Sequence, residues 1–296
     1  MPSLGVAEPV ASGDERVRRR SRTAPPPPGP VARTRQLLRY GLAMLFAWLA
    51  VRALFRVRVE GRDRLPAGPA LLCFNHQSWT DPFVLMATLP WRPRLYFFGP
   101  KESDMSKGAR NRVMSWTGTA IPFRPTKDDL IEATRKVERV FEQGGVVAIA
   151  GEGRIHAGER ELFPLDEGAA FFALRSRVPL VPVAINGTSW LAFGRTIRVR
   201  VGEPIPTGGR PNHEAVEALS SRAWTALHEL VNDYPDPVPP APGSRWYRIT
   251  ETFNEWPAGG REAARPPAAA AVPEPASTGT EPAPDGPASG GPESSG

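Results

Sequence analysis

The sequence Asn75-His76-Gln77-Ser78-Trp79-Thr80-Asp81 separates two segments of opposite character. Before it, residues 69–74 (PALLCF) are a short apolar run without helical polar periodicity, which predicts a buried strand. After it, residues 82–87 (PFVLMA) can begin a helix, with Asp81 as the N-cap and Pro82 in the first helical position. A histidine therefore stands where a strand ends and a carboxylate where a helix begins. In an α/β sheet this edge is where ligands bind.

The spacing of His76 and Asp81 has two interpretations. In the first, a turn brings Asp81 to one ring nitrogen of His76, which fixes the tautomer, leaves the other nitrogen as a base and stabilises the imidazolium. In the second, His76 is an ordinary strand-end side chain and Asp81 only caps a helix, because the pattern H-x4-D is common by chance. The remaining blocks of the sequence bear on this choice.

Strand and helix patterns alternate along the middle of the chain. Apolar runs predict strands at residues 70–74, 94–98, 146–150, 180–185 and 196–201. Helical patterns occupy residues 82–88, 105–116, 127–143, 167–176 and 212–232. The alternation predicts an α/β fold with a single, largely parallel sheet that is flanked by helices on both faces.

Composition divides the chain into four parts. Residues 1–34 are a basic Pro/Arg-rich arm and residues 257–296 a Pro/Ala/Gly-rich tail, and both are too poor in apolar residues for a core, which predicts disorder. Residues 35–56 predict a hydrophobic helix whose uninterrupted apolar part, 40–51, is shorter than the roughly 20 residues that cross a bilayer. We expect this helix in the membrane interface; the alternative is a buried first helix of the domain 57–256.

Charge and cysteine content limit the possible partners. The 296 residues carry a formal net charge of +6, and residues 1–39 hold eight arginines against three acids. A basic arm before an apolar segment favours a membrane surface of anionic lipid, and no nucleic-acid-binding motif supports the alternative of nucleic acid. Cys73 is the single cysteine, which excludes an internal disulfide and is expected in the core of a cytosolic protein. The four histidines are scattered, so a protein-bound metal is not expected.

Four blocks follow one another in the middle of the chain. The first is residues 75–81, similar to an NHxSxxD motif, and the second is residues 118–124 (GTAIPFR), similar to G-x-x-[IF]-x-x-R. The third, residues 151–154 (GEGR), resembles FPEGTR, and the fourth, residues 178–183 (VPLVPV), resembles V-P-[IV]-V-P-V. In this order, over residues 57–205, they resemble the glycerolipid acyltransferase family typified by 1-acyl-glycerol-3-phosphate acyltransferase.

The resemblance implies a glycerol-3-phosphate acyltransferase-like fold and an enzyme at the cytoplasmic face of the cell membrane. It implies transfer of a fatty acyl group from acyl-CoA or acyl carrier protein, with no further cofactor, to the hydroxyl of a lysophospholipid. The first candidate acceptor is 1-acyl-glycerol-3-phosphate, which gives phosphatidate. His76 is then the general base and Asp81 orients it. The residues implied in acceptor binding are Lys101, Gly118, Arg124, Glu152, Gly153 and Arg154.

The chain departs from the family pattern in the acceptor-binding blocks. Ala150-Gly151 replaces Phe-Pro, Arg154 comes one residue early, and Asp166-Glu167 is acidic where the family often has a basic residue. The acceptor therefore stays open, with another lysolipid or an amino-acid lipid as alternatives. For each basic residue, the alternative to phosphate binding is a surface charge paired with a nearby acid.

Two other functional classes remain as alternatives. A serine hydrolase would use Ser78, or Cys73 as a thiol nucleophile, but the chain lacks the G-x-S-x-G elbow. We instead expect Ser78 to order the turn by a local hydrogen bond. The oxyanion of acyl transfer would be met by backbone N–H groups near Asp81 or in the loop 151–153. The third class is a non-catalytic membrane-binding protein.

Overall fold

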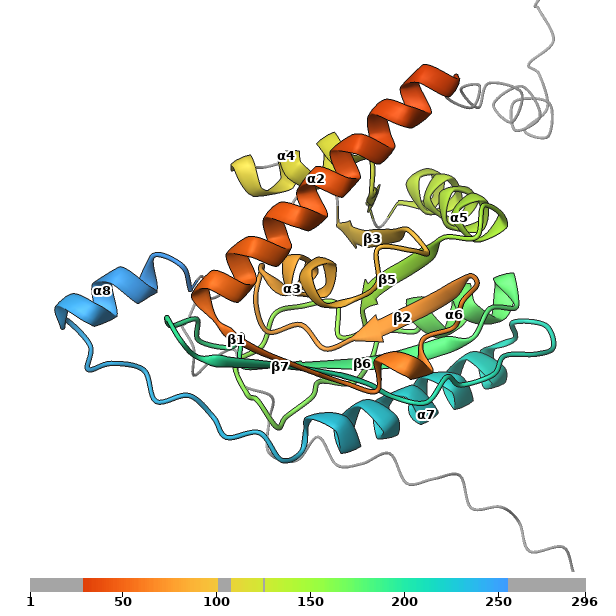
Figure 1. Cartoon of the computed structure of the whole chain (residues 1–296). Helices are drawn as coiled ribbons and strands as arrows, with labels where there is room; N and C mark the ends of the chain where they lie inside the picture. The colour runs from red at the N-terminus through yellow and green to blue at the C-terminus, as the bar shows by residue number, and fades with distance from the viewer. Residues whose placement is uncertain (1–28, 101–107, 125, 255–296) are drawn as a thin grey trace, which may run out of the picture.

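Short apolar segments form the centre of a seven-stranded sheet in the computed structural model, which describes residues 29–100, 108–124 and 126–254 (Figure 1). The strands are β1 (Arg56–Glu60), β2 (Ala70–Phe74), β3 (Leu95–Pro100), β4 (Ala120–Phe123), β5 (Val146–Ala150), β6 (Leu180–Asn186) and β7 (Thr196–Val201). Their order across the sheet is β1-β7-β6-β2-β5-β3-β4. Neighbours are parallel except β6 and β7, so β1 and β7 run opposite to the other five strands. The predicted largely parallel sheet is confirmed.

Helices cover both faces of the sheet (Figure 1). They are α2 (Pro30–Leu54), α3 (Asp81–Thr88), α4 (Gly108–Thr117), α5 (Lys127–Glu142), α6 (Gly168–Ser176), α7 (His213–Val231) and α8 (Arg245–Glu251), with a 3-10 turn η1 (Arg62–Arg64). One apolar core contains residues of α2, α3 and α4, and the other contains residues of α5, α6 and α7. The order of elements therefore produces three layers, helices on either side of the sheet.

The alternation of side chains in β2 explains why its sequence lacks polar positions. Leu71 and Cys73 lie in the core on the side of α6, whereas Leu72 and Phe74 lie in the core on the side of α3. Because a central parallel strand has no face toward water, each of its side chains is buried and each must be apolar.

The predicted elements agree with the structure in the interior and differ at the edges. The strands β2, β5 and β7 have the predicted bounds, but the sequence analysis missed β1, β4 and α8. The predicted helix cap is wrong, because the N-cap is Thr80 and Asp81 is the first residue of α3. Of the predicted terminal segments, residues 1–28 and 257–296 lie outside the described residues.

Helix α2 has a buried face and an exposed apolar face. It is one continuous helix that begins at Pro30, five residues before the predicted start, and ends at Leu54. One side packs on the domain, with buried side chains at Tyr40, Ala43, Met44, Ala47 and Val51. The other side exposes Leu38, Leu42, Leu45, Phe46 and Leu49. Within the described residues it is the one helix long and apolar enough to cross a membrane by length and composition. The buried face agrees with the alternative of a buried first helix of the domain. The exposed apolar face is compatible with the expected position in the membrane interface.

The two faces of α2 should differ in their contribution to stability. Met44→Ala removes a side chain with 0% exposure and should lower the free energy of unfolding by about 2–5 kcal/mol. Phe46→Ala, on the face where the ring is 72% exposed, should change it by no more than about 0.5 kcal/mol. Urea denaturation of both variants measures the difference. Equal losses would show that α2 does not pack as described.

Candidate active site

The carboxyl ends of the parallel strands bring distant sequence blocks to one edge of the sheet. His76 follows β2, Arg124 follows β4, and Glu152 and Arg154 follow β5, and these three strands run in the same direction. Lys101 follows β3 but lies outside the described residues. The structure therefore places four of the predicted site residues at the edge where ligands bind in α/β sheets.

Asn75 joins this edge to the neighbouring strand β6. Its amide Nδ2 donates to the carbonyl oxygen of Ile185 at 2.8 Å, and its Oδ1 accepts from the Ile185 N–H at 2.7 Å. The side chain thus continues the ladder between β2 and β6 for one more residue, while the backbone is released into the turn. An amide is suited to this position because it carries both a donor and an acceptor.

His76 and Asp81 are in contact within the turn. His76 Nδ1 lies 2.9 Å from Asp81 Oδ2, and the same oxygen accepts the backbone N–H groups of Gln77 and Ser78 at 2.8 and 2.9 Å. Asp81 has 0% exposure, whereas the imidazole of His76 is 10% exposed. A buried carboxylate needs such partners, so the turn and the orientation of the ring depend on one oxygen atom.

The predicted local hydrogen bond of Ser78 is confirmed. Ser78 Oγ accepts from the Thr80 backbone N–H at 3.2 Å and from the Thr80 hydroxyl at 3.0 Å. These bonds tighten the two residues that precede α3.

Glu152 supports the turn from the loop after β5. Its Oε1 accepts the backbone N–H of His76 at 3.2 Å, and its Oε2 accepts the N–H of Phe163 at 2.8 Å. The side chain has 0% exposure, and both oxygens are engaged by the protein. The sequence analysis expected Glu152 to contact the acceptor; its observed position makes it a support for the backbone of His76.

His156 was missed by the sequence analysis although it touches the same group. Its Nε2 lies 3.0 Å from Glu152 Oε1, and its backbone N–H donates to the carbonyl oxygen of His76 at 2.9 Å. Its side chain has 0% exposure and meets the ring of Phe163 edge-on at 5.9 Å between centroids. The N–H and the carbonyl of His76 are therefore both held by the loop after β5. A histidine four residues after the glutamate was the available signal.

A second buried carboxylate fixes the far part of this loop. Glu159 has 0% exposure and accepts from the backbone of Gly187 and from the hydroxyl of Ser189. Burial raises the pKa of Glu159, and these hydrogen bonds oppose the rise. Gln77 Nε2 donates to Gly158 O at 2.8 Å, which links the turn to the same loop.

The predicted acceptor-binding residues are distributed over two edges. Arg154 lies over the ring of Phe163 at 3.6 Å, and Arg124 is exposed at the end of β4. Gly153 has a φ of +64°, and a Cβ there would collide with the carboxylate of Asp166, so this turn requires glycine. Gly118 precedes β4 and therefore lies at the opposite edge, in a turn with φ of +67°.

The structure also bears on two other candidates from the sequence, the Cys73 thiol and the backbone N–H groups of the loop 151–153. Burial and the nearby Glu152 raise the pKa of Cys73 to about 12, so its thiol stays protonated at neutral pH and is not activated as a nucleophile. The N–H groups of Gly151 and Gly153 bond to the carbonyls of Phe74 and Ala150. These two N–H groups therefore do not point to a substrate oxyanion.

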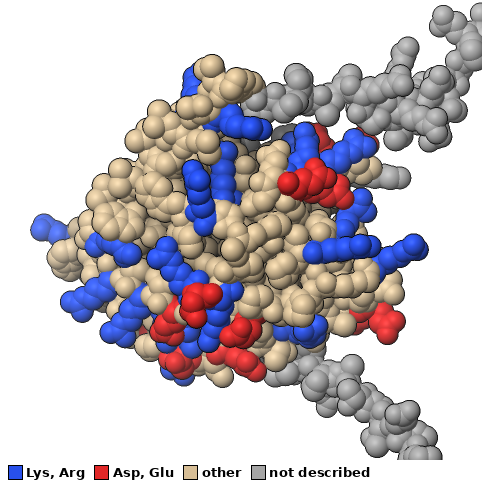
Figure 2. Space-filling view, turned by 45° about the vertical axis from the view of Figure 1, so that its right-hand side comes forward, with Lys and Arg blue, Asp and Glu red and all other residues tan. Residues whose placement is uncertain are grey.

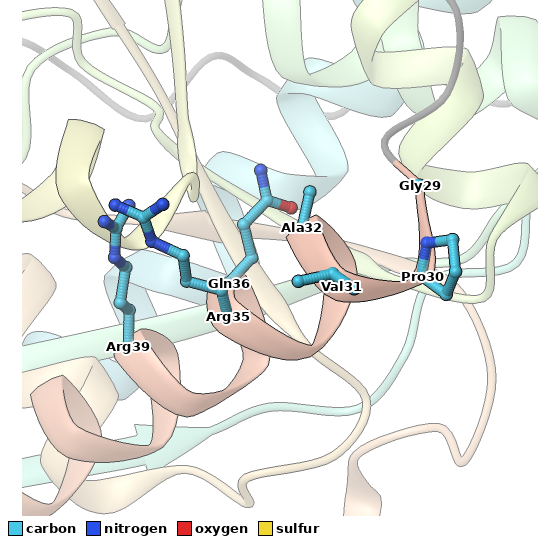
Figure 3. A pocket seen from close by; sticks show the side chains of 7 residues that line it. All are labelled: Gly29, Pro30, Val31, Ala32, Arg35, Gln36 and Arg39. Carbon is cyan, nitrogen blue, oxygen red and sulfur yellow. The ribbon is translucent and has the colours of Figure 1, made fainter.

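A hollow along the first turns of α2 is separate from this edge. Figure 3 shows Arg35, Gln36 and Arg39 extending from the same side of the helix. The residues that line this hollow are Gly29, Pro30, Val31, Ala32, Arg35, Gln36 and Arg39. Gln36 lies beside Gly118, at the edge opposite to His76. Among the described residues, no group of three or more His, Cys, Asp or Glu side chains is placed to hold a metal ion.

Comparison with known proteins gives consistent matches. A sequence model described as Acyltransferase matches residues 56–186. The 1-acyl-sn-glycerol-3-phosphate acyltransferase of Saccharomyces cerevisiae is 26% identical over 191 residues, which cover 56% of this chain and 60% of that protein. The human 1-acyl-sn-glycerol-3-phosphate acyltransferase beta is 32% identical over 175 residues, which cover 52% of this chain and 58% of that protein. The chain thus spans less than two thirds of the length of either relative.

A solved structure has a similar fold. The crystal structure of the 1-acyl-sn-glycerophosphate (LPA) acyltransferase, PlsC, from Thermotoga maritima superposes with a TM-score of 0.53 at 18% identity, over 74% of this chain and 86% of that chain. At this identity the similarity concerns the fold.

The buried contacts of Glu152 should make it more important for stability than an exposed glutamate. Glu152→Gln replaces an acceptor oxygen by a donor and should lower the free energy of unfolding by about 1–3 kcal/mol, because a buried N–H loses its partner. Glu138→Gln, which breaks a partly exposed ion pair with Arg175, is the control and should cost no more than about 1 kcal/mol. Urea denaturation checks both values. A smaller loss for Glu152→Gln than for the control would contradict the described contacts.

Proposed function

We propose that this chain, which matches an acyltransferase sequence model over residues 56–186, transfers a fatty acyl group from a thioester donor to the hydroxyl of a lysophospholipid. The observation that carries the proposal is the contact of 2.9 Å between His76 Nδ1 and Asp81 Oδ2 at the carboxyl edge of the sheet. The matches to acyltransferases of 1-acyl-glycerol-3-phosphate support this acceptor, and phosphatidate is then the product.

The mechanism needs one base and no protein nucleophile. His76 Nε2 takes the proton of the acceptor hydroxyl as the hydroxyl oxygen attacks the thioester carbonyl carbon. Asp81 stabilises the imidazolium that forms and keeps Nδ1 protonated. When the tetrahedral intermediate collapses, the new C–O bond remains, the C–S bond breaks, and the imidazolium returns the proton to the thiolate. The thiol belongs to coenzyme A or to acyl carrier protein, and both are candidate donors.

Residues around His76 hold it before the substrate arrives. Glu152 and His156 engage the N–H and the carbonyl of His76. Because a base must be held close to its productive position, these contacts favour proton transfer without touching the substrate. We assign Glu152 and His156 as positioning residues.

The phosphate of the acceptor is assigned to Arg124, with Lys101 and Arg154 as further cations. Arg124 is exposed at the same edge as His76 and carries a guanidinium suited to bidentate phosphate binding. Arg154 already lies over Phe163, so its contribution requires contact from the outer side of this pair. The place of Arg124 at the carboxyl end of β4, at the same edge as His76, supports its choice as the principal phosphate ligand.

A membrane location would supply both lipids. The exposed apolar face of α2 supports contact with the bilayer, and Arg52 and Arg56 lie exposed near its end. Figure 2 shows Lys and Arg side chains spread over the visible face, with Asp and Glu collected in smaller groups. A net positive charge favours anionic lipid on the cytoplasmic side.

The principal test is formation of phosphatidate from labelled acyl-CoA and 1-acyl-glycerol-3-phosphate by the purified protein. His76→Ala should reduce kcat/KM by about 10³-fold, since the general base is lost. Ser78→Ala, which removes only the hydroxyl bonded to Thr80, should reduce it by no more than about tenfold. A protein that retains turnover as His76→Ala but loses it as Ser78→Ala would be a serine hydrolase-type enzyme. Vesicle binding by a wild-type protein without turnover would favour the non-catalytic alternative.

The acceptor assignment has its own test. Arg124→Gln should raise KM for 1-acyl-glycerol-3-phosphate by about 10- to 100-fold and leave KM for the thioester nearly unchanged, because a charge-assisted bond to phosphate is lost. Arg222→Gln, at an exposed position on α7, is the matched control and should have no effect. A panel with a lysophospholipid of another headgroup, an amino-acid lipid and monoacylglycerol checks selectivity. Equal use of uncharged monoacylglycerol would reject the phosphate-binding role.

A further inference from the structure

Helix α8 lies outside the residues matched by the acyltransferase model and exposes large apolar side chains. Trp246 and Ile249 are one turn apart, with 64% and 39% exposure, and Phe253 follows the last turn with 48% exposure. Thr250 and Asn254 are buried on the side toward the domain. The segment therefore has one side docked on the protein and one apolar side toward solvent.

The docked side of α8 is fixed to the segment that connects β6 and β7. Asn254 Oδ1 accepts the Leu191 N–H at 2.7 Å, and Asn254 Nδ2 donates to the Leu191 carbonyl at 3.2 Å. Tyr247 lies against the buried ring of Trp190, with 5.4 Å between centroids. These contacts give α8 a defined position although it has only seven residues.

The same connecting segment touches the end of α2. The N–H of Gly194 donates to the carbonyl of Leu54 at 2.8 Å, and the preceding Phe193 is 65% exposed. Trp48 and Leu49, near the end of α2, are also exposed. Figure 1 shows α8 and the end of α2 on the same side of the molecule. The segment between β6 and β7 thus contacts both α8 and the last residue of α2.

The residues that follow α8 are also bonded to the turn that carries the proposed base. The indole Nε1–H of Trp79 donates to the carbonyl oxygen of Phe253 at 2.9 Å. Trp79 lies between His76 and Asp81 in the sequence and meets the ring of Phe83 edge-on. One hydrogen bond therefore links the turn to the segment that follows α8.

We propose that Phe193, Trp246, Ile249 and Phe253, here named the α8 face, enter the interface of an anionic bilayer beside the catalytic turn. Aromatic side chains, indole above all, favour the membrane interface. Arg245 and Arg248 are exposed on the same helix against the single acid Glu251, so the flanking charge is positive and complementary to anionic headgroups. The α8 face is separate from the apolar face of α2 and extends the lipid contact to the edge that holds His76.

The catalytic consequence rests on the proposed function. With α8 held at the bilayer, the bond between Trp79 and Phe253 holds the turn while an acceptor enters from the lipid. Turnover of a bilayer-embedded acceptor therefore depends on the α8 face, whereas turnover of a soluble acceptor does not.

The binding test uses the full chain without substrates and vesicles of phosphatidylcholine mixed with phosphatidylglycerol. The double variant Trp246→Ala, Ile249→Ala should partition to these vesicles about 10- to 100-fold more weakly than wild type. Trp91→Ala is the matched control, because its ring is 49% exposed in the loop between α3 and β3, at the edge opposite to His76. It should partition as wild type does. Arg245→Gln, Arg248→Gln should lose about tenfold on mixed vesicles and little on phosphatidylcholine alone.

Thermal unfolding of each variant should match wild type, because the substituted side chains are exposed. Wild-type partitioning by the double variant, or an equal loss in Trp91→Ala, would overturn the proposal. The proposal would also be overturned if wild type formed a dimer and the double variant a monomer, with equal vesicle binding by both. The α8 face would then contact a second copy.

A kinetic arm separates this inference from the proposed function. The double variant should lose most turnover with a long-chain acceptor embedded in vesicles and keep turnover with a short-chain, water-soluble acceptor. If wild type partitions through the α8 face but transfers no acyl group, the proposed function fails and the lipid-contact surface stands. If wild type is active and the double variant is equally active on both acceptors, the catalytic link to α8 fails.

Discussion

One oxygen atom of Asp81 organises the turn after β2. Asp81 Oδ2 accepts two backbone N–H groups and faces His76 Nδ1, all within 2.9 Å, at a position without solvent exposure. A buried carboxylate without partners would be strongly unfavourable, so the chain can reach this conformation only with the turn closed around it. The contacts that close the turn therefore also fix the orientation of the imidazole. The geometry of the site is fixed before any substrate binds, as catalysis by a positioned base requires.

The strand order explains why blocks separated by 76 residues act together. The strand β2 lies between β5 and β6, so the turn after β2 has the loop after β5 on one side and the end of β6 on the other. Asn75 bonds to β6, and Glu152 bonds to the backbone of His76 from the β5 side. These strands are far apart in the sequence. Their carboxyl ends still lie close together, because neighbouring parallel strands end at the same edge of the sheet.

Sequence patterns predicted the interior of the fold because burial on both faces leaves a clear apolar signal, as in β2 and β5. They missed β1, whose RVRVE sequence alternates arginine with valine at the edge of the sheet, and α8, which has only seven residues. The contact of His76 with Asp81 was one of two interpretations of their spacing, and the blocks that resemble the acyltransferase family favoured it. The orientation of the Glu152 side chain could not be predicted. A carboxylate in a loop can face solvent or the backbone, and the tertiary contacts determine which of the two it does. Gly118 was assigned by its block, although a glycine of φ +67° has a sufficient reason in its own turn.

The reversed strands connect α2 to the edge of the sheet that holds His76. The strands β1 and β7 run opposite to β2, and Arg56 pairs with Thr196, so the start of β1 lies at the edge where β2 ends. Because α2 leads directly into β1, its last turn reaches the same edge as His76. Had β1 run parallel to β2, α2 would have ended at the opposite edge, far from the turn. The direction of one edge strand thus places the end of α2, a helix with an exposed apolar face, at the edge that holds His76. Under the proposed function, this arrangement would shorten the path of a water-insoluble acceptor from the bilayer to His76.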